Sequence, residues 1–246
     1  MKITYLHHSG FVVTEGTEAL VFDYWRDTED GYLHKNVLPY VSRLYVFASH
    51  FHADHFNAEV LTWQTSCDVI YVFGKDILRH RRASESDAHY LAKGAIFEDD
   101  SVSVQALGST DSGVSFGVQW RGYKLFHAGD LNNWHWSDES TVKEAEQAEK
   151  RFLGELKDIH RLQSDAFDVA FFPVDARIGR DYDRGIRQFV DLLKPHMVVP
   201  MHFTANGFGS LLSVKVAIEA VGCRYWLIQS EGETLELTQS ENADGL

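Results

Sequence analysis

The stretch Ser49-His50-Phe51-His52-Ala53-Asp54-His55-Phe56 places three imidazoles and a carboxylate within six residues. It follows directly on an apolar run, residues 44–48, whose pattern indicates a buried strand. Imidazole nitrogen and carboxylate oxygen are the usual protein ligands of zinc, iron and manganese. A strand end that presents this H-x-H-x-D-H pattern therefore predicts the first part of a metal site.

Length and composition favour one domain that spans residues 1–246. The chain is 44% hydrophobic and 13% aromatic, which is ample for a large core without stabilising disulfides. Its two cysteines, Cys67 and Cys223, are far apart and outside any C-x-x-C spacing, as is typical of a reducing, cytoplasmic setting. No stretch resembles a secretory leader or a membrane span, so we expect a soluble protein with no membrane partner.

The charge balance bears on the kind of partner. A net charge of −13 disfavours nucleic acid, because affinity for a phosphate backbone comes mainly from lysine and arginine. We therefore expect a small-molecule substrate. Self-association into a homo-oligomer stays open.

The hydrophobic pattern alternates between strands and helices along the chain. We expect helices over residues 57–66, 138–162, 183–194 and 210–221, with one or two short helices within residues 75–93. The second of these helices rests on apolar residues at spacings of three and four, namely Val142, Ala145, Ala148, Phe152, Leu156 and Ile159. We expect strands over residues 2–6, 10–14, 19–22, 44–48, 68–73, 95–97, 101–106, 114–120, 123–127, 168–172, 197–200, 224–228 and 234–237. This order predicts an α/β (α+β) fold with two mixed β-sheets packed face to face and helices outside.

Two further strand ends carry metal-ligand chemistry. Asp130 follows the strand over residues 123–127, and Gly129 before it lets the backbone turn sharply. His202 follows the strand over residues 197–200. Together with the first cluster, these residues have the chemistry to complete a metal site.

These motifs, in this order over the whole chain, resemble the metallo-β-lactamase fold superfamily. The opening Tyr5-Leu6-His7-His8-Ser9-Gly10-Phe11 is also similar to the L-G-H-S-x-F opening of the branch that contains ascorbate-6-phosphate lactonase. The resemblance implies a four-layer αββα sandwich. It also implies that His50 and His52 bind one metal, that Asp54, His55 and His202 bind a second, and that Asp130 bridges the two. By the same resemblance, Asp23 orients the ligand loop by hydrogen bonding and His8 lies at the rim.

One departure from the family pattern concerns the first metal. The family supplies a third histidine from a mid-chain loop, but the matching loop here, residues 108–113, contains none. Asp111 or a water could take its place, or the site could hold a single metal. His127 and His135 are further candidates because they lie near Asp130 in the sequence. We expect zinc, one or two ions per chain, with manganese or iron as alternatives favoured by oxygen ligands.

The expected function is that of a metal-dependent hydrolase that uses a metal-bound hydroxide at a dinuclear site. Asp54 or Asp130 would orient the hydroxide and accept its proton. Four more residues are candidates for the substrate pocket or for support of the ligands: Trp134, His135, Asp175 and Arg177. They favour a small polar substrate, a lactone or a phosphoester.

The same pattern of metal ligands is compatible with two other functions. One is a phosphodiesterase or nuclease, which the acidic composition disfavours. The other is a non-catalytic metal-binding protein, which the missing histidine allows. Metal analysis and a panel of phosphodiester and lactone substrates would separate the three.

Overall fold

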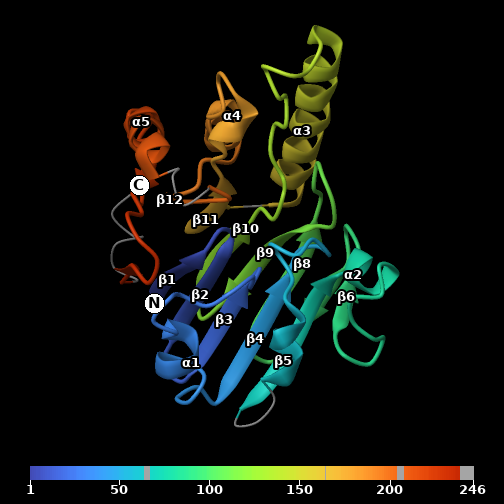
Figure 1. The fold of residues 1–246 in the computed structure, drawn as a ribbon, viewed down its shortest axis with the longest axis vertical. Helices are drawn as coiled ribbons and strands as arrows, with labels where there is room; N and C mark the ends of the chain where they lie inside the picture. Colours follow the sequence, from blue (N-terminus) through green and yellow to red (C-terminus); the bar gives the residue numbers. More distant parts are fainter. Residues whose placement is uncertain (64–66, 164, 204–207, 239–246) are drawn as a thin grey trace.

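The computed structural model describes residues 1–63, 67–163, 165–203 and 208–238, which form two seven-stranded sheets (Figure 1). Sheet A has the order β14-β1-β2-β3-β4-β5-β6, and sheet B has the order β13-β12-β11-β10-β9-β8-β7. The strands of sheet A are β1 (Lys2–His7), β2 (Gly10–Glu15), β3 (Glu18–Phe22), β4 (Arg43–Ala48), β5 (Asp68–Gly74), β6 (His89–Leu91) and β14 (Thr234–Glu236). The strands of sheet B are β7 (Ile96–Glu98), β8 (Val102–Leu107), β9 (Ser115–Trp120), β10 (Tyr123–His127), β11 (Val169–Pro173), β12 (Met197–Met201) and β13 (Arg224–Tyr225).

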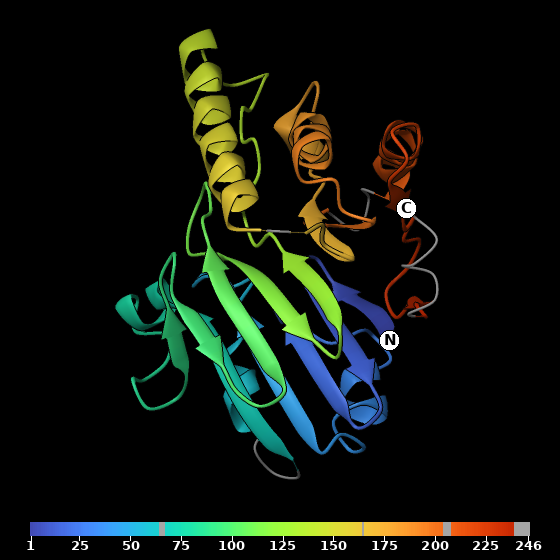
Figure 2. The same cartoon turned by 180° about the vertical axis from the view of Figure 1, so that it is seen from behind.

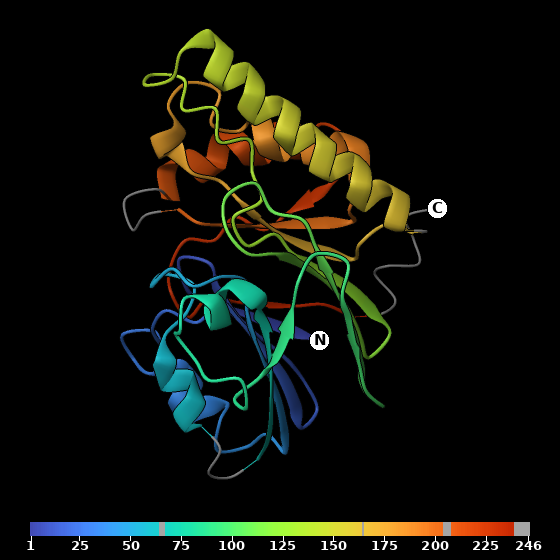
Figure 3. The ribbon, with the colours of Figure 1, turned by 90° about the vertical axis from the view of Figure 1, so that its right-hand side faces the viewer.

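Helices cover the outer face of each sheet, which gives the four layers visible in Figure 3. The helices outside sheet B are α3 (Val142–Leu162), α4 (Arg184–Leu193) and α5 (Phe208–Glu219). The short helices α1 (Tyr32–Asn36), η1 (Ala58–Thr62) and α2 (Lys75–Arg79) lie outside sheet A, and η2 (Ala176–Ile178) follows β11. The αββα sandwich expected from the sequence is thus confirmed.

Strand direction brings the chemistry to one edge of the sandwich. In sheet A, β3, β4 and β5 run parallel, and in sheet B, β10, β11 and β12 run parallel. Figure 2 shows β8 to β10 lying in front of sheet A. Ligands of α/β sheets bind at the carboxyl ends of the strands. The loops that follow these strands in the two sheets therefore meet at one edge of the sandwich.

Aromatic side chains join the two sheets behind that edge. The ring centroid of Phe22 on β3 lies 4.7 Å from that of Phe47 on β4 and 5.8 Å from that of Phe171 on β11. Phe47 in turn lies 5.6 Å from Phe116 on β9. All four side chains are fully buried. Aromatic pairs of this kind contribute about 0.5–1.5 kcal/mol each beyond the burial of their surface, so they fix how the sheets meet.

The structure corrects several predicted helices. The segment predicted as a helix over residues 57–66 forms the 3₁₀ turn η1, where Thr62 Oγ1 donates a hydrogen bond to the Glu59 carbonyl. Residues 64–66 lie outside the described residues. Helix α3 begins after Thr141 instead of at residue 138, because Thr141 and Glu144 form a capping box. Val142, predicted for the buried face, is 76% exposed because it is the first helical residue, beyond the sheet.

Some elements were not predicted, or only in part. The segment over residues 75–93 contains a strand, β6, besides the helix α2. Helices α1 and η2 were not predicted, and β13 stops at Tyr225 although its strand was predicted to reach residue 228.

Both cysteines are free. Among the described helices, none combines the length and hydropathy needed to cross a bilayer.

Candidate metal centre

Five loops supply the candidate ligands and the supporting residue Asp23, and each follows a strand end at the shared edge. The sheet A loops carry His8 after β1, Asp23 after β3 and the H-x-H-x-D-H cluster after β4. The sheet B loops carry Asp130 after β10 and His202 after β12. His8, Asp23 and His202 have φ values of 57°, 41° and 61°, in the left-handed region that side chains rarely adopt. Such backbone strain is typical of functional sites.

Asp23 is buried and holds the ligand loop from behind. Its Oδ1 accepts the Ser49 backbone N–H at 2.7 Å, and its Oδ2 accepts the Ser49 hydroxyl at 2.6 Å and His55 Nδ1–H at 2.7 Å. Because the Ser49 hydroxyl donates to Asp23, its oxygen can accept from His50 Nδ1–H, 2.9 Å away. Both imidazoles then direct Nε2 toward Asp130. These hydrogen bonds are of the kind that the family resemblance implied for Asp23.

A second carboxylate orients His202. Asp175 is 1% exposed, and its Oδ2 accepts His202 Nδ1–H at 3.1 Å. Arg177 binds the same carboxylate with two nitrogens, Nε at 2.9 Å from Oδ1 and Nη2 at 2.6 Å from Oδ2. Burial alone would raise the pKa of Asp175, but the hydrogen bonds from His202 and Arg177 hold this pKa well below its usual range. His202 Nε2 is therefore free to face Asp130.

Asp130 lies between the histidines of the two sheets. Its Oδ2 is 3.3 Å from His50 Nε2, while its Oδ1 is 3.1 Å from His55 Nε2 and 3.3 Å from His202 Nε2. Close packing of the loops permits this position: Gly129 has φ 52°, and a Cβ there would be 2.7 Å from Ser49 Cβ. Burial raises the pKa of Asp130, yet the imidazoles of His55, His50 and His202 lower this pKa well below its usual range.

Two candidate ligand sets share this centre. Single atoms of His8, Asp54, His55 and His202 all lie within 4.8 Å of one another, as do single atoms of His50, His52 and Asp130. Three buried atoms of these residues face one another or Asp54 without a well-aligned hydrogen bond within the described part of the chain: His8 Nε2, His55 Nε2 and Asp130 Oδ1. Buried polar atoms without a satisfied hydrogen bond are costly, and here they converge. The donor atoms therefore fit metal ions.

A third geometric set, Asp23, His50 and His55, does not add a site. Both oxygens of Asp23 already accept hydrogen bonds from Ser49 and His55. Asp111 lies beside the set of His50, His52 and Asp130, with Oδ2 3.8 Å from His52 Nδ1. Its side chain is 52% exposed, so the carboxylate is open to solvent.

His8 lies deeper than the rim position that the sequence predicted. It is 6% exposed, and its carbonyl accepts the His202 backbone N–H at 3.0 Å. Its Nε2 is 3.3 Å from Asp54 Oδ2. Burial lowers the pKa of His8 to about 4, although Asp54 opposes the shift. At neutral pH this imidazole is uncharged, as a metal ligand must be.

The lowered pKa of His8 predicts a pH dependence of stability. Between pH 6.5 and about 4, the unfolded chain binds a proton at this position that the folded chain does not. The contribution of His8 to stability is therefore complete above pH 6.5 and decreases as the pH falls toward 4. In EDTA, we expect His8→Gln to flatten the pH dependence of the unfolding free energy by up to about 1.4 kcal/mol per pH unit in this window. Urea unfolding at several pH values measures it, and the exposed His160→Gln is the control; parallel curves for His8→Gln and wild type would contradict the prediction.

A pocket of about 540 Å³ opens from Asp130 and His202. Trp134 and Trp136 line it and stack on each other with centroids 5.8 Å apart, and Trp134 lies 5.3 Å from His202. Arg177 and Asp111 also line this pocket. The tryptophans thus form an aromatic wall beside the candidate ligands.

Two other histidines lie outside the ligand sets. His135 is buried, with its ring nitrogens 3.0 Å from the Asn133 and Arg180 carbonyls. His127 is buried too, with Nε2 3.0 Å from the Ser9 carbonyl and Nδ1 accepting the Gly129 backbone N–H. Neither belongs to a candidate set among the described residues. Both hold loops of the site in place.

Comparison with known proteins decides the family. A model of the beta-lactamase superfamily domain matches residues 2–149, more than half of the chain. The chain belongs to this superfamily. The resemblance seen in the sequence is thereby confirmed at the level of the superfamily, while the lactonase branch stays a prediction.

Relatives of this beta-lactamase superfamily member match it over its length. A protein of Pelotomaculum thermopropionicum named UPF0173 metal-dependent hydrolase is 25% identical, over 96% of this chain and all of its own length. The structure of Igni18, a metallo hydrolase from Ignicoccus hospitalis, covers 96% of this chain and 99% of its own with a TM-score of 0.67 and 20% identity. CmlA, a diiron beta-hydroxylase from Streptomyces venezuelae, matches with a TM-score of 0.64 and 13% identity, over 96% of this chain and 54% of its own. Proteins with this fold are thus named for different reactions, so the function of this chain has to be inferred from the residues of its site.

Sequence reasoning missed one wall of the pocket in this superfamily member. Glu144, Ala148 and Arg151 of α3 line it, together with Thr110 and Ser140. The spacing of Glu144, Ala148 and Arg151 by four and three residues was visible, because such positions share one face of a helix. The sequence could not show that this face of the helix lines the pocket.

Proposed function

We propose that this chain is a metal-dependent hydrolase with a dinuclear site that acts on a small polar substrate, a lactone or a phosphoester. The observation that carries the proposal is the position of Asp130, whose two oxygens face different histidine sets. A carboxylate in that position would offer one oxygen to each of two ions. The names of the relatives, metal-dependent hydrolase and metallo hydrolase, support the reaction class.

The donor atoms determine which metal the chain would hold. His8, Asp54, His55 and His202, with Asp130 Oδ1, form a set rich in imidazole. His50 and His52, with Asp130 Oδ2 and the nearby Asp111, form a set with more oxygen. Imidazole-rich sets suit zinc, and additional oxygens shift the preference toward manganese or iron. Zinc is the first metal to test.

Bound ions would supply the activation of water, because two adjacent metals lower the pKa of a water that they share toward neutrality. The protein's own groups do the rest. Asp23 and Asp175 fix the tautomers of His50, His55 and His202. Burial raises the pKa of Asp54, but its contacts with His8 and His55 lower this pKa well below its usual range, so that Asp54 is ionised. An ionised Asp54 suits a metal ligand better than a proton acceptor.

The pocket fits a small molecule. At about 540 Å³ it is in the size range of small-molecule sites, and its tryptophan wall excludes water from one side. The net charge of −13 disfavours a nucleic acid substrate. The lining side chains therefore favour a compact, polar substrate.

Metal analysis and a substrate panel test the proposal. We expect two ions per chain after reconstitution with zinc, loss of activity on removal of the metal by a chelator, and recovery when zinc is returned. The panel compares lactones, phosphomonoesters, phosphodiesters and simple esters with one and the same preparation. Unchanged hydrolysis by protein that mass spectrometry shows to be free of metal would refute the proposed mechanism, and a single ion in a fully active enzyme would exclude the dinuclear site.

A further inference from the structure

We propose that Arg151 and Arg177 form an anion-binding subsite in the pocket, so that the substrate carries a negatively charged group apart from the bond that is cleaved. The inference rests on the proposed function and names the class of its substrate: small carboxylate- or phosphate-bearing compounds. Neither the family match nor the names of the relatives assign a role to Arg151.

The pocket connects the candidate metal ligands to both guanidinium groups. Asp130 and His202 line it, and so do Arg151 and Arg177. Trp134 and Trp136 form the wall beside them. A substrate whose scissile bond lies at the metals can therefore reach an arginine with its other end.

Helix α3 directs Arg151 into this space. Glu144, Ala148 and Arg151 are separated by four and three residues, and all three line the pocket. The small Ala148 leaves room between the two longer side chains. Arg151 thus projects from the middle of a helix that is well fixed by the buried Phe152 and Leu156.

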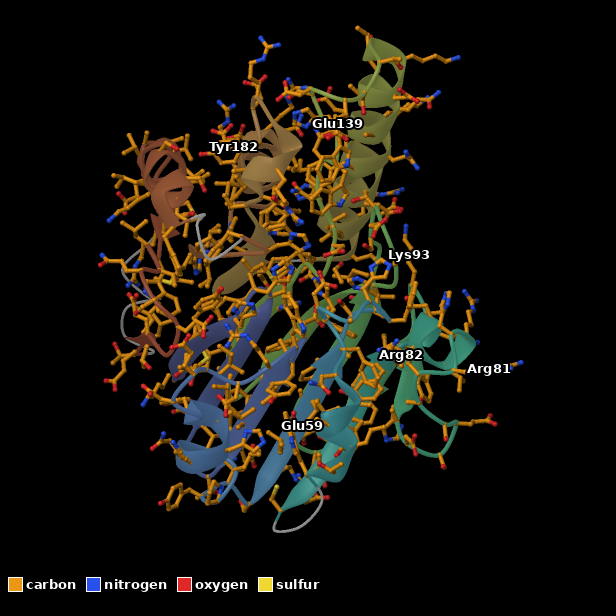
Figure 4. The ribbon with its side chains drawn as sticks, viewed as in Figure 1. Glu59, Arg81, Arg82, Lys93, Glu139 and Tyr182 are labelled. Carbon is orange, nitrogen blue, oxygen red and sulfur yellow. The ribbon has the colours of Figure 1, made fainter. Side chains whose placement is uncertain are left out.

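The acidic neighbours of Arg151 on the helix have other partners. Glu155, one turn further along, pairs with Lys93 at 2.6 Å near the C-terminal end of α3 (Figure 4). Glu144 accepts hydrogen bonds from the backbone N–H and the hydroxyl of Thr141 in the capping box. Among the described residues, no carboxylate is paired with Arg151. In a chain with a net charge of −13, an exposed arginine that lines a pocket without a paired carboxylate is available for an anionic ligand.

Arg177 is held in place and still has donors to offer. Asp175 binds its Nε and Nη2, and no hydrogen bond from its Nη1 to a described residue is present. Its side chain is 53% exposed. The hydrogen bonds to Asp175 raise the pKa of Arg177, and the charges of Asp54 and Asp130 add to the rise, which places this guanidinium within the electrostatic reach of the metal ligands.

The charges beyond the subsite limit the length of the anion. A hollow of about 310 Å³ shares Trp136, Ser140 and Glu144 with the pocket and adds Glu139. Glu139 lies on the loop that runs beside α3 (Figure 4). A polyanion that extended from the pocket into this hollow would meet the carboxylates of Glu139 and Glu144. The arrangement therefore favours a short ligand with one remote charge over a nucleic acid strand.

Binding of simple carboxylates to the zinc-loaded protein tests the subsite without knowledge of the substrate. Succinate, glutarate and adipate place a second carboxylate at increasing distances from the first, and butyrate is the singly charged reference. We expect at least one dicarboxylate to bind wild type about tenfold more tightly than butyrate, and Arg151→Gln to remove most of that difference. Lys150→Gln is the matched control, because it makes the same charge change on the same helix outside the pocket lining, and we expect it to alter either affinity less than twofold.

Hydrolysis of two esters separates this inference from the proposed function. Mono-4-nitrophenyl glutarate carries a remote carboxylate, whereas 4-nitrophenyl valerate does not. We expect Arg151→Gln to lower kcat/KM about tenfold for the first ester only. If wild type prefers no dicarboxylate over butyrate, or if Arg151→Gln and Lys150→Gln have equal effects, the subsite is refuted. If the chain hydrolyses no ester, lactone or phosphoester, the proposed function fails, and the titrations still decide the subsite.

Discussion

Replacing Asp130 with asparagine is expected to lower the metal content from two ions per chain to about one and to lower kcat by on the order of 10³-fold. The reason is geometric, because this one carboxylate has an oxygen within 3.3 Å of His50, His55 and His202. Asparagine keeps the shape of the side chain but offers a single neutral oxygen. Both ligand sets lose their common member in one substitution.

Asp138→Asn is the matched control, because Asp138 is an exposed aspartate eight residues further along the chain and outside the candidate sets. Metal content by mass spectrometry and kcat on any substrate from the panel measure the outcome. Circular dichroism shows whether Asp130→Asn still folds. A folded Asp130→Asn protein with two ions and unimpaired kcat would contradict the bridging position.

The double replacement His50→Ala and His52→Ala is expected to empty the first set, which is His50, His52 and Asp130. The second set, which is His8, Asp54, His55 and His202, is expected to keep its ion. The first set would retain only Asp130 Oδ2 and the exposed Asp111, whereas the second keeps all three of its histidines. We expect about one ion per chain and a loss of activity of about a hundredfold or more, because water activation by two ions depends on both.

The paired variant for this experiment is His89→Ala with His160→Ala, which removes two histidines outside the candidate sets. Its metal content and activity should equal those of wild type. If the His50 and His52 double variant keeps one ion and full activity, a single-metal enzyme is the correct description. If it binds no ion at all, the two sets are not independent.

The pattern of apolar residues was sufficient to predict most strands, because buried strands such as β4 and β12 are continuous hydrophobic runs. It could not predict β6, which is a three-residue strand in a polar segment paired only with β5. Nor could it predict that β14 joins sheet A beside β1, because that pairing depends on contacts between the two ends of the chain. The start of α3 was within reach, since Thr141 and Glu144 are a recognisable capping box.

The candidate ligands were predictable because their residue types are rare in combination and follow strand ends. The residues that hold these ligands by hydrogen bonds were only partly predictable. Asp23 was inferred by resemblance, but the bond from Ser49 that sets the His50 tautomer depends on three-dimensional packing. Arg151 carried no signal in the sequence, because an arginine on an amphipathic helix ordinarily faces solvent. Only the placement of α3 over sheet B made it part of the pocket.

The division of the ligands between the sheets has a consequence for how the protein matures. Each set needs groups from both sheets: His50 and His52 need Asp130, and His8, Asp54 and His55 need His202. An unfolded chain cannot assemble either set, because residues so distant in sequence meet only after the sheets dock. Bound ions would thus link the two sheets at this edge, and their binding would stabilise the folded chain relative to the unfolded one.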